Sequence, residues 1–559
     1  MKIYKGLVFL ASLLLLVGCE GFLTQKGQDQ YIPKTTADFK ELLYGEAGFY
    51  HLTELNSIYG YASKGYTFAH YMTDDVEFFN AVTDRPTSSD YDSPVASWIE
   101  RSVLNAYMDV MQGAFTWQQD IEQEHFINEN YVYLYHHVLT ANLCLMNVEQ
   151  SEGTDEEKDI LKGQASFTRA FAYFMLANLY AKPYNKSQPT DLCVPLKTDV
   201  APWITASRAT MAQVWGVIVD DVETALRTLE GKTINENKHH INYQTALVLA
   251  ARIYLYMENW DKVIECGEKF RTLYLSKYPI YDITGMAITE KFTYNGTLTT
   301  PPFNRSDNSE IVWVMGDNGS TTGGSSPYFD CFKPTDTSTG ANAVTLCIRV
   351  SSMDSTGLVN QYRNGDHRLS SWFYAPVKKS ETRPLFRYNY TVGKIIKSGT
   401  RISFSSPIIR CHGMFRTSEV ILMLAEAYAR QATPDRTNAV AMLDELRSKR
   451  IDAAHYATER WTEGDFASPQ ALVDSIFQER RRELCFEELH RWWDLRRMDN
   501  ASRPTIVHRW KNRVKYTLSN TDDAGYVLDF PVKELEVSGA TLVPNTRPAR
   551  PSQPDGATP

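Results

Sequence analysis

Hydrophobic positions recur with helical spacing over most of this chain. In residues 211–229, for example, one helical face collects Val214, Trp215, Ile218, Val222 and Leu226. The same spacing predicts helices over residues 37–47, 130–149, 158–180, 211–229, 243–257, 260–273, 419–430, 437–450 and, as one long final helix, 469–497. The pattern therefore predicts a mainly helical protein.

Two pairs of these helices follow one scheme. Ala246, Ala250 and Tyr254 recur every four residues and precede a tight turn at Asn259. Residues 424–428 repeat the scheme with a longer turn before the next helix. Small residues let paired helices approach closely, and aromatic rings fill the groove between them. This is typical of degenerate tetratricopeptide-like pairs, although plain antiparallel helix packing produces a similar pattern.

The region from about residue 278 to 410 has a different composition. Thr, Ser, Gly and Asn dominate, and residues 320–326 read Ser-Thr-Thr-Gly-Gly-Ser-Ser. Residues 311–314 (Ile-Val-Trp-Val) have the character of a short strand. We expect short strands and ordered loops laid over a helical scaffold, because a structureless loop of this length is unusual inside a compact domain. Such insertions often carry binding residues.

The N-terminus has the pattern of a secretory signal peptide. Lys2 and Lys5 precede an apolar run over residues 6–17, and the run ends in Leu-Val-Gly before Cys19. The run is too short to span a bilayer as a helix. Its ending resembles the bacterial lipobox, in which the cysteine is acylated. We therefore expect export, removal of residues 1–18 and lipidation of Cys19, with lipid as the protein's only membrane anchor.

Composition narrows the classes of partner. The chain has 559 residues and a net charge of −9, and it contains no basic run long enough to follow a phosphate backbone, so we expect no nucleic-acid partner. Aromatic residues make up 12% of the chain, with 32 Tyr and 11 Trp, and such rings suit stacking on ligands as well as packing.

The cysteines indicate neither a zinc site nor a catalytic thiol. Cys144, Cys266 and Cys485 fall inside helical patterns, where a thiol is usually a small buried hydrophobic group. Cys331 and Cys347 are available for a disulfide in an oxidising compartment, and the sequence leaves that pairing open.

Several motifs, in this order, resemble one known family. They are Cys19-x2-Phe22-Leu23, residues 169–176 (RAFAYFML), residues 416–420 (RTSEV), residues 479–487 (ERRRELCFE) with 491–497 (RWWDLRR), and residues 530–535 (FPVKEL). Together they make the chain similar to the SusD/RagB family of nutrient-binding outer-membrane lipoproteins of Bacteroidetes.

The resemblance implies a mainly α, SusD-like helical body with four tetratricopeptide-like helix pairs and a loop-rich region with short β-strands. It implies an N-terminal SusD-like part at 19–235 and a C-terminal RagB/SusD part at 236–559, packed as one body. It also implies a partner, a SusC-like TonB-dependent transporter, to which the protein delivers a captured glycan at the outer membrane, facing the cell surface. Some members capture peptide instead.

The charged segment 479–497 suggests chemistry, but packing explains it better. Glu487-x-x-His490 has the spacing of di-metal carboxylate bundles, yet no second motif of this kind lies in a convincing core helix. We expect no metal, no cofactor and no enzymatic activity, since no nucleophile motif is present either. Instead, the sequence predicts ion pairs that orient this helix, formed by Arg480, Arg481, Arg482, Glu483, Glu487 and Asp494. Phe486, Trp492 and Trp493 are predicted core residues.

Two stretches combine aromatic rings with polar groups that suit sugar hydroxyls. The first lies within residues 71–101, with Asp74, Asp75, Tyr91, Trp98 and Arg101 as candidate ligand-binding residues. The second lies within residues 318–372, with Tyr328 and Trp372. Trp98 and Tyr328 are favoured, since polar residues surround them; ordinary packing is the competing interpretation for each ring. Peptide capture and a helical-repeat scaffold without a nutrient ligand remain the alternative functions.

Overall fold

In a computed structural model, the structure describes residues 33–46, 66–80, 112–119, 127–202, 206–235, 237–284, 292–293, 308–316, 346–351, 355–374, 376–377, 391–392, 411–510 and 514–554. Candidate residues Cys19, Tyr91, Trp98, Arg101 and Tyr328, together with Cys331, lie outside the described residues.

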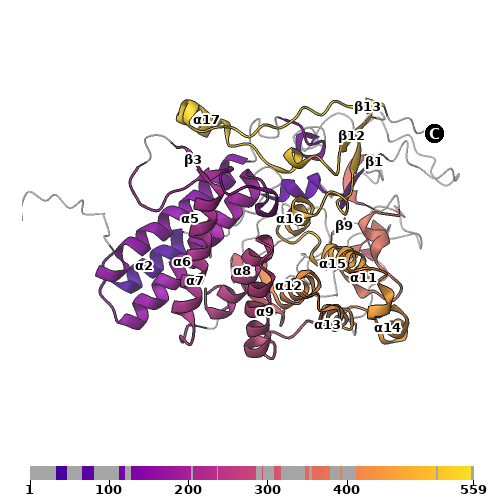
Figure 1. Ribbon diagram of the computed structural model, residues 1–559, viewed down its shortest axis with the longest axis horizontal. Helices are drawn as coiled ribbons and strands as arrows, with labels where there is room; N and C mark the ends of the chain where they lie inside the picture. The colour runs from indigo at the N-terminus through magenta and orange to yellow at the C-terminus, as the bar shows by residue number, and fades with distance from the viewer. Residues whose placement is uncertain are drawn as a thin grey trace, which may run out of the picture.

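The described part is mainly helical (Figure 1), as the sequence predicts. The long helices are α2 (Thr36–Glu46), α5 (Ile127–Asn147), α6 (Asp155–Tyr180), α7 (Met211–Leu229), α8 (Tyr243–Tyr256), α9 (Trp260–Tyr274), α12 (Thr417–Arg430), α13 (Arg436–Arg447), α15 (Pro469–Leu484) and α16 (His490–Arg497). Shorter helices are α11 (His367–Trp372), α14 (Ala453–Glu459) and α17 (Val532–Ser538). Among the described helices, none combines the length and apolar character needed to cross a membrane.

Local sequence signals start several of these helices. Thr154 and Thr210 each accept a hydrogen bond from the backbone N–H three residues on, and the side chain of that third residue accepts one from the backbone N–H of the cap. Ser468 caps α15, whose first residue is Pro469. These signals explain why the predicted helix starts are close to the observed ones.

The predicted helix pairs are present. Helices α8 and α9 form one antiparallel hairpin and α12 and α13 form a second, and α9 packs against α12. Ala246 and Ala250 are fully buried, as the predicted close approach requires. At Gly267 on α9, an added Cβ would lie 2.7 Å from the end of the Leu424 side chain on α12, so a larger residue here requires Leu424 to shift.

The strands form small two- or three-stranded sheets rather than one large sheet. The ladders are β1 (Val76–Asn80) with β6 (Leu346–Val350), β5 (Ile311–Gly316) with β10 (Cys411–Arg416), β2 (Leu192–Pro195) with β3 (Arg208–Thr210), β4 (Phe292–Thr293) with β8 (Pro376–Val377), β7 (Phe373–Tyr374) with β9 (Thr391–Val392), and β11 (Ile506–Trp510) with β12 (Val514–Leu518) and β13 (Gln553–Pro554). The strand predicted at 311–314 is confirmed within β5.

The predicted single helix at 469–497 is wrong. The chain leaves the helix after Leu484 and starts α16 at His490, and in between Phe486 and Glu488 take positive φ values of 57° and 39°. Periodicity gave no sign of this break. Tertiary ion pairs accompany it, since Glu487 accepts from Arg416 on β10 while Glu488 accepts from Arg252 on α8. A continuous helix would not aim two adjacent carboxylates at these two elements.

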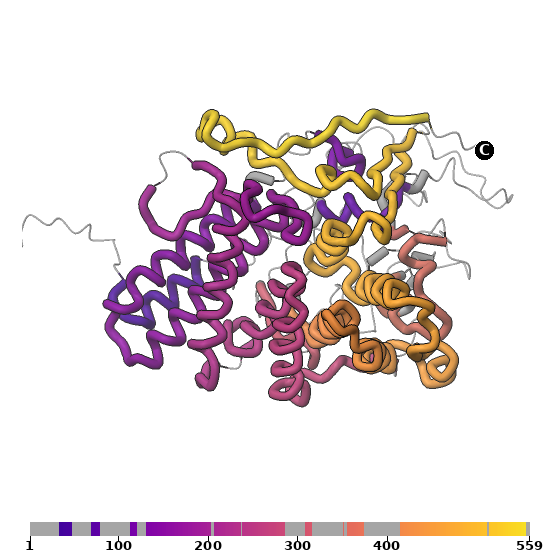
Figure 2. Tube along the Cα trace, viewed as in Figure 1, coloured from indigo at the N-terminus to yellow at the C-terminus, as the bar shows by residue number. Residues whose placement is uncertain are grey.

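The C-terminal segment lies across the N-terminal helices (Figure 2). Leu528 donates its N–H to the carbonyl of Leu179, at 3.0 Å. The side-chain amide of Asn545 donates to the carbonyl of Tyr180 at 2.6 Å. The end of α6 thus receives its hydrogen bonds from residues about 350 positions later in the chain.

A fully buried set of charges joins the helices to the loop region. We call it the ion cluster; it consists of Arg368, Arg416, Arg447, Arg450, Arg482, Glu310, Asp366, Glu479, Glu483 and Glu487. Five guanidinium groups face five carboxylates, and none of these side chains is more than 7% exposed. The ion cluster contains Arg482, Glu483 and Glu487 of the predicted ion pairs, and Arg480 pairs with Asp494 at 2.9 Å, as predicted.

Glu483 lies at the centre of the ion cluster. It accepts from Arg416 at 2.7 Å, from Arg450 at 2.8 Å and from Arg368 at 2.9 Å. Burial by itself raises the pKa of Glu483, but Arg450 and Arg416 outweigh it and hold the pKa well below its usual value. Glu483 on α15 thus binds three arginines from three other segments.

Beside the ion cluster, two buried carboxylates share one guanidinium. Arg252 donates to Glu419 at 2.7 Å and to Glu488 at 2.8 Å, and all three side chains are almost completely buried. Burial raises the pKa of Glu488 to about 7, because the charge of Arg252 is shared with Glu419 and only partly offsets it.

We expect Gly267→Ala to lower the free energy of unfolding by about 1–3 kcal/mol, because the new methyl group overlaps Leu424. Helix propensity favours Ala by about 1 kcal/mol and offsets part of this loss. Urea unfolding measures the change. Gly45→Ala on α2, where an added Cβ meets nothing within 4 Å, is the control and should be neutral or stabilising. Equal effects of the two variants would contradict the close α9–α12 crossing.

We expect Glu488→Gln to remove part of the pH dependence of stability. The folded protein binds the Glu488 proton more tightly than the unfolded chain does, so this group's contribution falls as the pH rises from 4.5 to about 7. The variant should show a flatter change of unfolding free energy over that window. Glu265→Gln, at a largely exposed position on α9, should leave the slope as it is. An unchanged slope in Glu488→Gln would show that Glu488 is ionised throughout.

Candidate functional site

The described part of the first candidate stretch is residues 71–80. It contains Asp74 and Asp75, directly before strand β1. The Asp75 side chain is 2% exposed and that of Asp74 is 17% exposed. Both carboxylates face arginines of the C-terminal part of the chain. We call Asp74, Asp75, Arg481 and Arg491 the arginine clamp.

Arg481 binds three separate points of the chain. Its Nε donates to Asp75 Oδ1 at 2.7 Å, one terminal nitrogen donates to the carbonyl of Asp74 at 2.8 Å, and the other donates to the carbonyl of Thr356 at 2.9 Å. Thr356 belongs to the second candidate stretch. One side chain on α15 therefore holds both stretches in place.

Arg491 completes the arginine clamp with a bidentate pair. Its Nε and a terminal nitrogen donate to the two carboxylate oxygens of Asp74, each at 2.7 Å. Such fork-to-fork geometry fixes orientation as well as distance. Arg491 lies one residue after the start of α16, so the helix break after Leu484 is what allows Arg481 and Arg491 to approach the same pair of aspartates.

Electrostatics favour the charged form of Asp74. Burial raises the pKa of this carboxyl, but Arg481 and Arg491 outweigh it, and the pKa lies well below 3.8. Burial and the neighbouring Asp74 charge raise the pKa of Asp75, although Arg481 partly opposes them. Asp74 is thus an anion across the physiological pH range.

Strands β1 and β6 bring the two candidate stretches together. They pair antiparallel, from Val76 opposite Val350 to Asn80 opposite Leu346. At the clamp end, Ser351 donates its N–H to the carbonyl of Asp75 and its hydroxyl to the carbonyl of Asp74, both at 2.8 Å. The chain leaves β1 at Asn80 toward Tyr91, Trp98 and Arg101, and it enters β6 at Leu346 from the side of Tyr328. Both segments are therefore attached to the same end of one ladder.

The described candidate residues are more buried than the sequence suggests. Trp372 is 1% exposed at the end of α11, with its ring 6.0 Å from the guanidinium groups of Arg368 and Arg450. Asp75 is engaged by Arg481. In this structure these side chains hold the scaffold together. The pairing of Cys331 with Cys347 stays a prediction; Cys347 lies in β6.

The residues considered for a metal site have other partners. Both oxygens of Glu487 accept from Arg416, at 2.6 and 3.0 Å. Within the described ranges, no group of three or more His, Cys, Asp or Glu side chains has a metal-binding arrangement. Cys144, Cys266 and Cys485 are buried free thiols, as predicted.

The sequence identified Asp74 and Asp75 as candidate residues but did not predict that they pair with Arg491 and Arg481. Arg481 was expected to orient its own helix, and Arg491 was noted only as part of a motif. The signal was present as a run of three arginines shortly before the predicted core residues Phe486, Trp492 and Trp493, because arginines that pack beside a core require acidic partners. No sequence pattern identified those partners, since Asp75 and Arg481 are 406 positions apart.

Two family models match the chain. A SusD-like model, described as starch-binding and associating with the outer membrane, matches residues 73–255. A second model, described as the SusD family, matches residues 387–534. Together the two segments cover more than half of the chain, and each contains one side of the arginine clamp. The comparison with curated proteins gives no match.

Solved structures share the fold over nearly the whole chain. A SusD superfamily protein from Bacteroides thetaiotaomicron is 19% identical with a TM-score of 0.62, covering 92% of this chain and 100% of that chain. A SusD-like carbohydrate binding protein from Bacteroides vulgatus is 18% identical with a TM-score of 0.60, covering 91% and 97%. Surface glycan-binding protein A from Bacteroides fluxus is 14% identical with a TM-score of 0.58, covering 92% and 99%. At these identities the likeness shows the fold alone.

We expect Asp74→Asn to destabilise the protein by about 3–5 kcal/mol, because it leaves the buried Arg491 cation without its bidentate partner. Asp159→Asn, which removes a half-exposed pair with Lys232, should cost about 1 kcal/mol or less. Urea unfolding at neutral pH compares the two.

Asp74→Asn should also change how the free energy of unfolding depends on pH in the acid range. Because the folded pKa of Asp74 lies well below 3.8, its contribution to stability is fully present above that pH and is lost as the pH falls from 3.8 through the lower folded pKa. Asp74→Asn should lose stability less steeply on acidification than the parent. Parallel acid profiles for the two proteins would show that the arginine clamp does not hold Asp74 ionised.

Proposed function

The chain belongs to the SusD/RagB family, and from this premise we propose that it is a non-catalytic receptor that binds an oligosaccharide or polysaccharide nutrient. We further propose that it is anchored to the outer membrane by lipid on Cys19, faces the cell surface and delivers its ligand to a SusC-like TonB-dependent transporter.

The β1–β6 ladder is the observation that carries this proposal. Glycan binding needs aromatic rings and polar groups from several segments on one surface, and the ladder attaches the two candidate stretches to one end of a rigid element. The arginine clamp fixes the other end through Arg481, which contacts Asp75 before β1 and Thr356 after β6. Tyr91, Trp98, Arg101 and Tyr328 are the proposed ligand-binding residues of the segments attached there.

The comparisons support a carbohydrate as the ligand class. The matched family model is described as starch-binding, and similar structures include a carbohydrate binding protein and a surface glycan-binding protein. Peptide capture, the alternative that the sequence leaves open, is the outcome that competes with glycan binding in the experiment below.

Calorimetric titration of residues 20–559 with polysaccharides, oligosaccharides and peptides tests the proposal. We expect saturable binding to one glycan class, with no new products on chromatography of the same samples. Trp98→Ala and Tyr328→Ala should each weaken this binding about tenfold, the loss of one stacking contact of roughly 1.4 kcal/mol.

Trp260→Ala provides the control, because this half-buried tryptophan lies on α9, outside both candidate stretches. It should leave the affinity unchanged. Binding to peptides alone would replace the glycan assignment, and released products would overturn the claim of binding without catalysis. Co-purification of the lipidated protein with an outer-membrane transporter tests delivery separately.

A further inference from the structure

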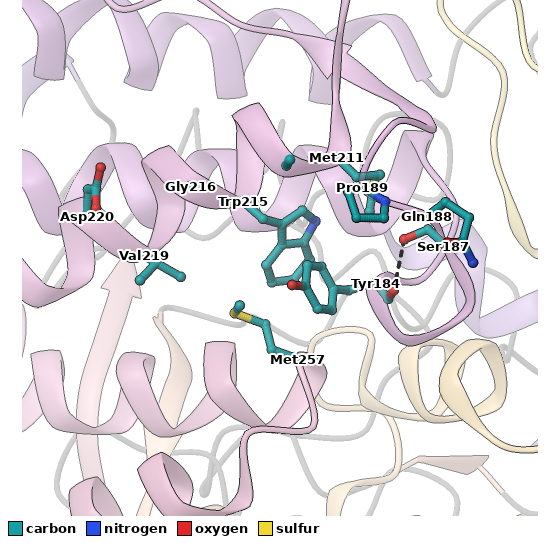
Figure 3. Close-up of a pocket in the computed structure, with 11 residues that line it drawn as sticks. Tyr184, Ser187, Gln188, Pro189, Met211, Trp215, Gly216, Val219, Asp220 and Met257 are labelled. Carbon is teal, nitrogen blue, oxygen red and sulfur yellow. Dashed lines mark hydrogen bonds between the residues drawn. The ribbon is translucent and has the colours of Figure 1, made fainter.

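A pocket that shares no lining residue with the β1–β6 ladder lies beside the first half of α7. This pocket of about 410 Å³ opens between α7, the segment Tyr184–Pro189 that follows α6, and Met257 at the end of α8 (Figure 3). Its volume is within the range of small-molecule sites. None of its lining residues belongs to the ion cluster, the arginine clamp or either candidate stretch.

The walls of the pocket are preformed. Pro189 accepts a hydrogen bond from the N–H of Ala212 at 3.0 Å, and Asp191 accepts one from the N–H of Met211 at 2.8 Å, so the segment is tied to the first turn of α7. Ser187 donates its hydroxyl to the carbonyl of Tyr184 at 2.8 Å. A ligand therefore meets a fixed wall and need not order a loop on binding.

The wall of the pocket holds an unmatched hydrogen-bond donor. Trp215 is 2% exposed, and its indole Nε1 has no acceptor among the described residues. Indole nitrogen donates only, and a buried donor without an acceptor costs free energy. The nitrogen is itself buried in the wall, so its N–H serves as a reporter of the pocket rather than as a contact to a ligand. Tyr184 lies against the same ring, with centroids 4.8 Å apart.

The rim of the pocket is polar and carries no positive charge. Asp220 is exposed and makes no hydrogen bond or ion pair within the described part of the chain, and Gln188 is exposed on the opposite side. None of the described lining residues is Lys, Arg or His, which disfavours phosphate, carboxylate and acidic sugars. The floor is apolar, with Met211, Val219 and Met257.

We propose that this pocket binds one unit of a neutral sugar. Its ring carbons pack on Met257 and Tyr184, and its hydroxyls donate to Asp220 and exchange hydrogen bonds with Gln188. A sugar hydroxyl both accepts and donates, which suits a rim that carries the carboxylate of Asp220 and the amide of Gln188. The choice of a carbohydrate rests on the proposed function; the site itself rests on the pocket.

The indole N–H signal of Trp215 reports on the pocket directly. In ¹⁵N-labelled residues 20–559 it is identified by its absence in Trp215→Phe. We expect one of maltose, cellobiose, mannobiose or galactobiose to shift it saturably, and Asp220→Asn to weaken that binding about tenfold. No shift with any of the four sugars overturns the proposal, as does a shift caused by the apolar probe N-acetyl-phenylalaninamide alone.

Gly216→Leu provides the blocking variant. Gly216 lies on the exposed face of α7, where an added Cβ meets nothing within 4 Å, so leucine enters the pocket without disturbing the core. It should abolish the Trp215 shift. Gly45→Leu makes the same change at an equally open, exposed position of α2 and should preserve the shift. A shift that survives Gly216→Leu places the sugar elsewhere and overturns the pocket.

Calorimetry on the same proteins separates this site from the proposed ladder site. If calorimetry detects glycan binding but the Trp215 indole N–H signal does not shift, the pocket proposal fails and the proposed function stands. If the Trp215 signal shifts and calorimetry detects no second glycan site, the pocket proposal stands and the proposed ladder site fails. If Gly216→Leu removes one of two binding sites and Trp98→Ala removes the other, both are correct.

Discussion

The carboxylate of Glu483 is the interaction on which the rest of the structure depends. It is completely buried on α15 and accepts hydrogen bonds from Arg368, Arg416 and Arg450. Each arginine comes from a different segment, so the helical body, the loop region and the β5–β10 ladder meet at one charge. A buried ion pair adds little net stability, since desolvation offsets the attraction, but a missing partner costs several kcal/mol. The segments must therefore all be in place together.

The arginine clamp extends this constraint to the proposed binding region. Arg481 follows Glu479 by two residues on α15, so the helix that carries the ion cluster also carries the side chain that holds β1 and the segment after β6. The break after Leu484 turns Arg491 toward the same aspartates. Because one end of the short ladder is held by the arginine clamp, the segments attached to its other end start from a fixed position. This is a physical reason for a receptor to place ligand-binding residues there.

The pocket at Trp215 and the ladder differ in construction. The ladder depends on charges brought together from distant parts of the chain. The pocket depends on a local feature, a segment bonded back onto the first turn of α7 within about 20 residues. Because the two features rest on different contacts, a substitution in one need not disturb the other. Two sugar-binding positions on one body would raise avidity for a polymeric ligand over that for a single unit.

The sequence by itself determined the helices, their approximate limits and the predicted core, because side-chain periodicity and capping are local properties. Its motifs also identified the family, and the charged run at 479–497 predicted ion pairs that the structure contains. Tertiary structure decided the break between α15 and α16, where Glu487 and Glu488 bind arginines on different elements. It also decided that Asp75 faces Arg481 and that Trp372 lies in the core. Such pairings join residues hundreds of positions apart, and no local pattern encodes which distant charge a buried carboxylate will meet.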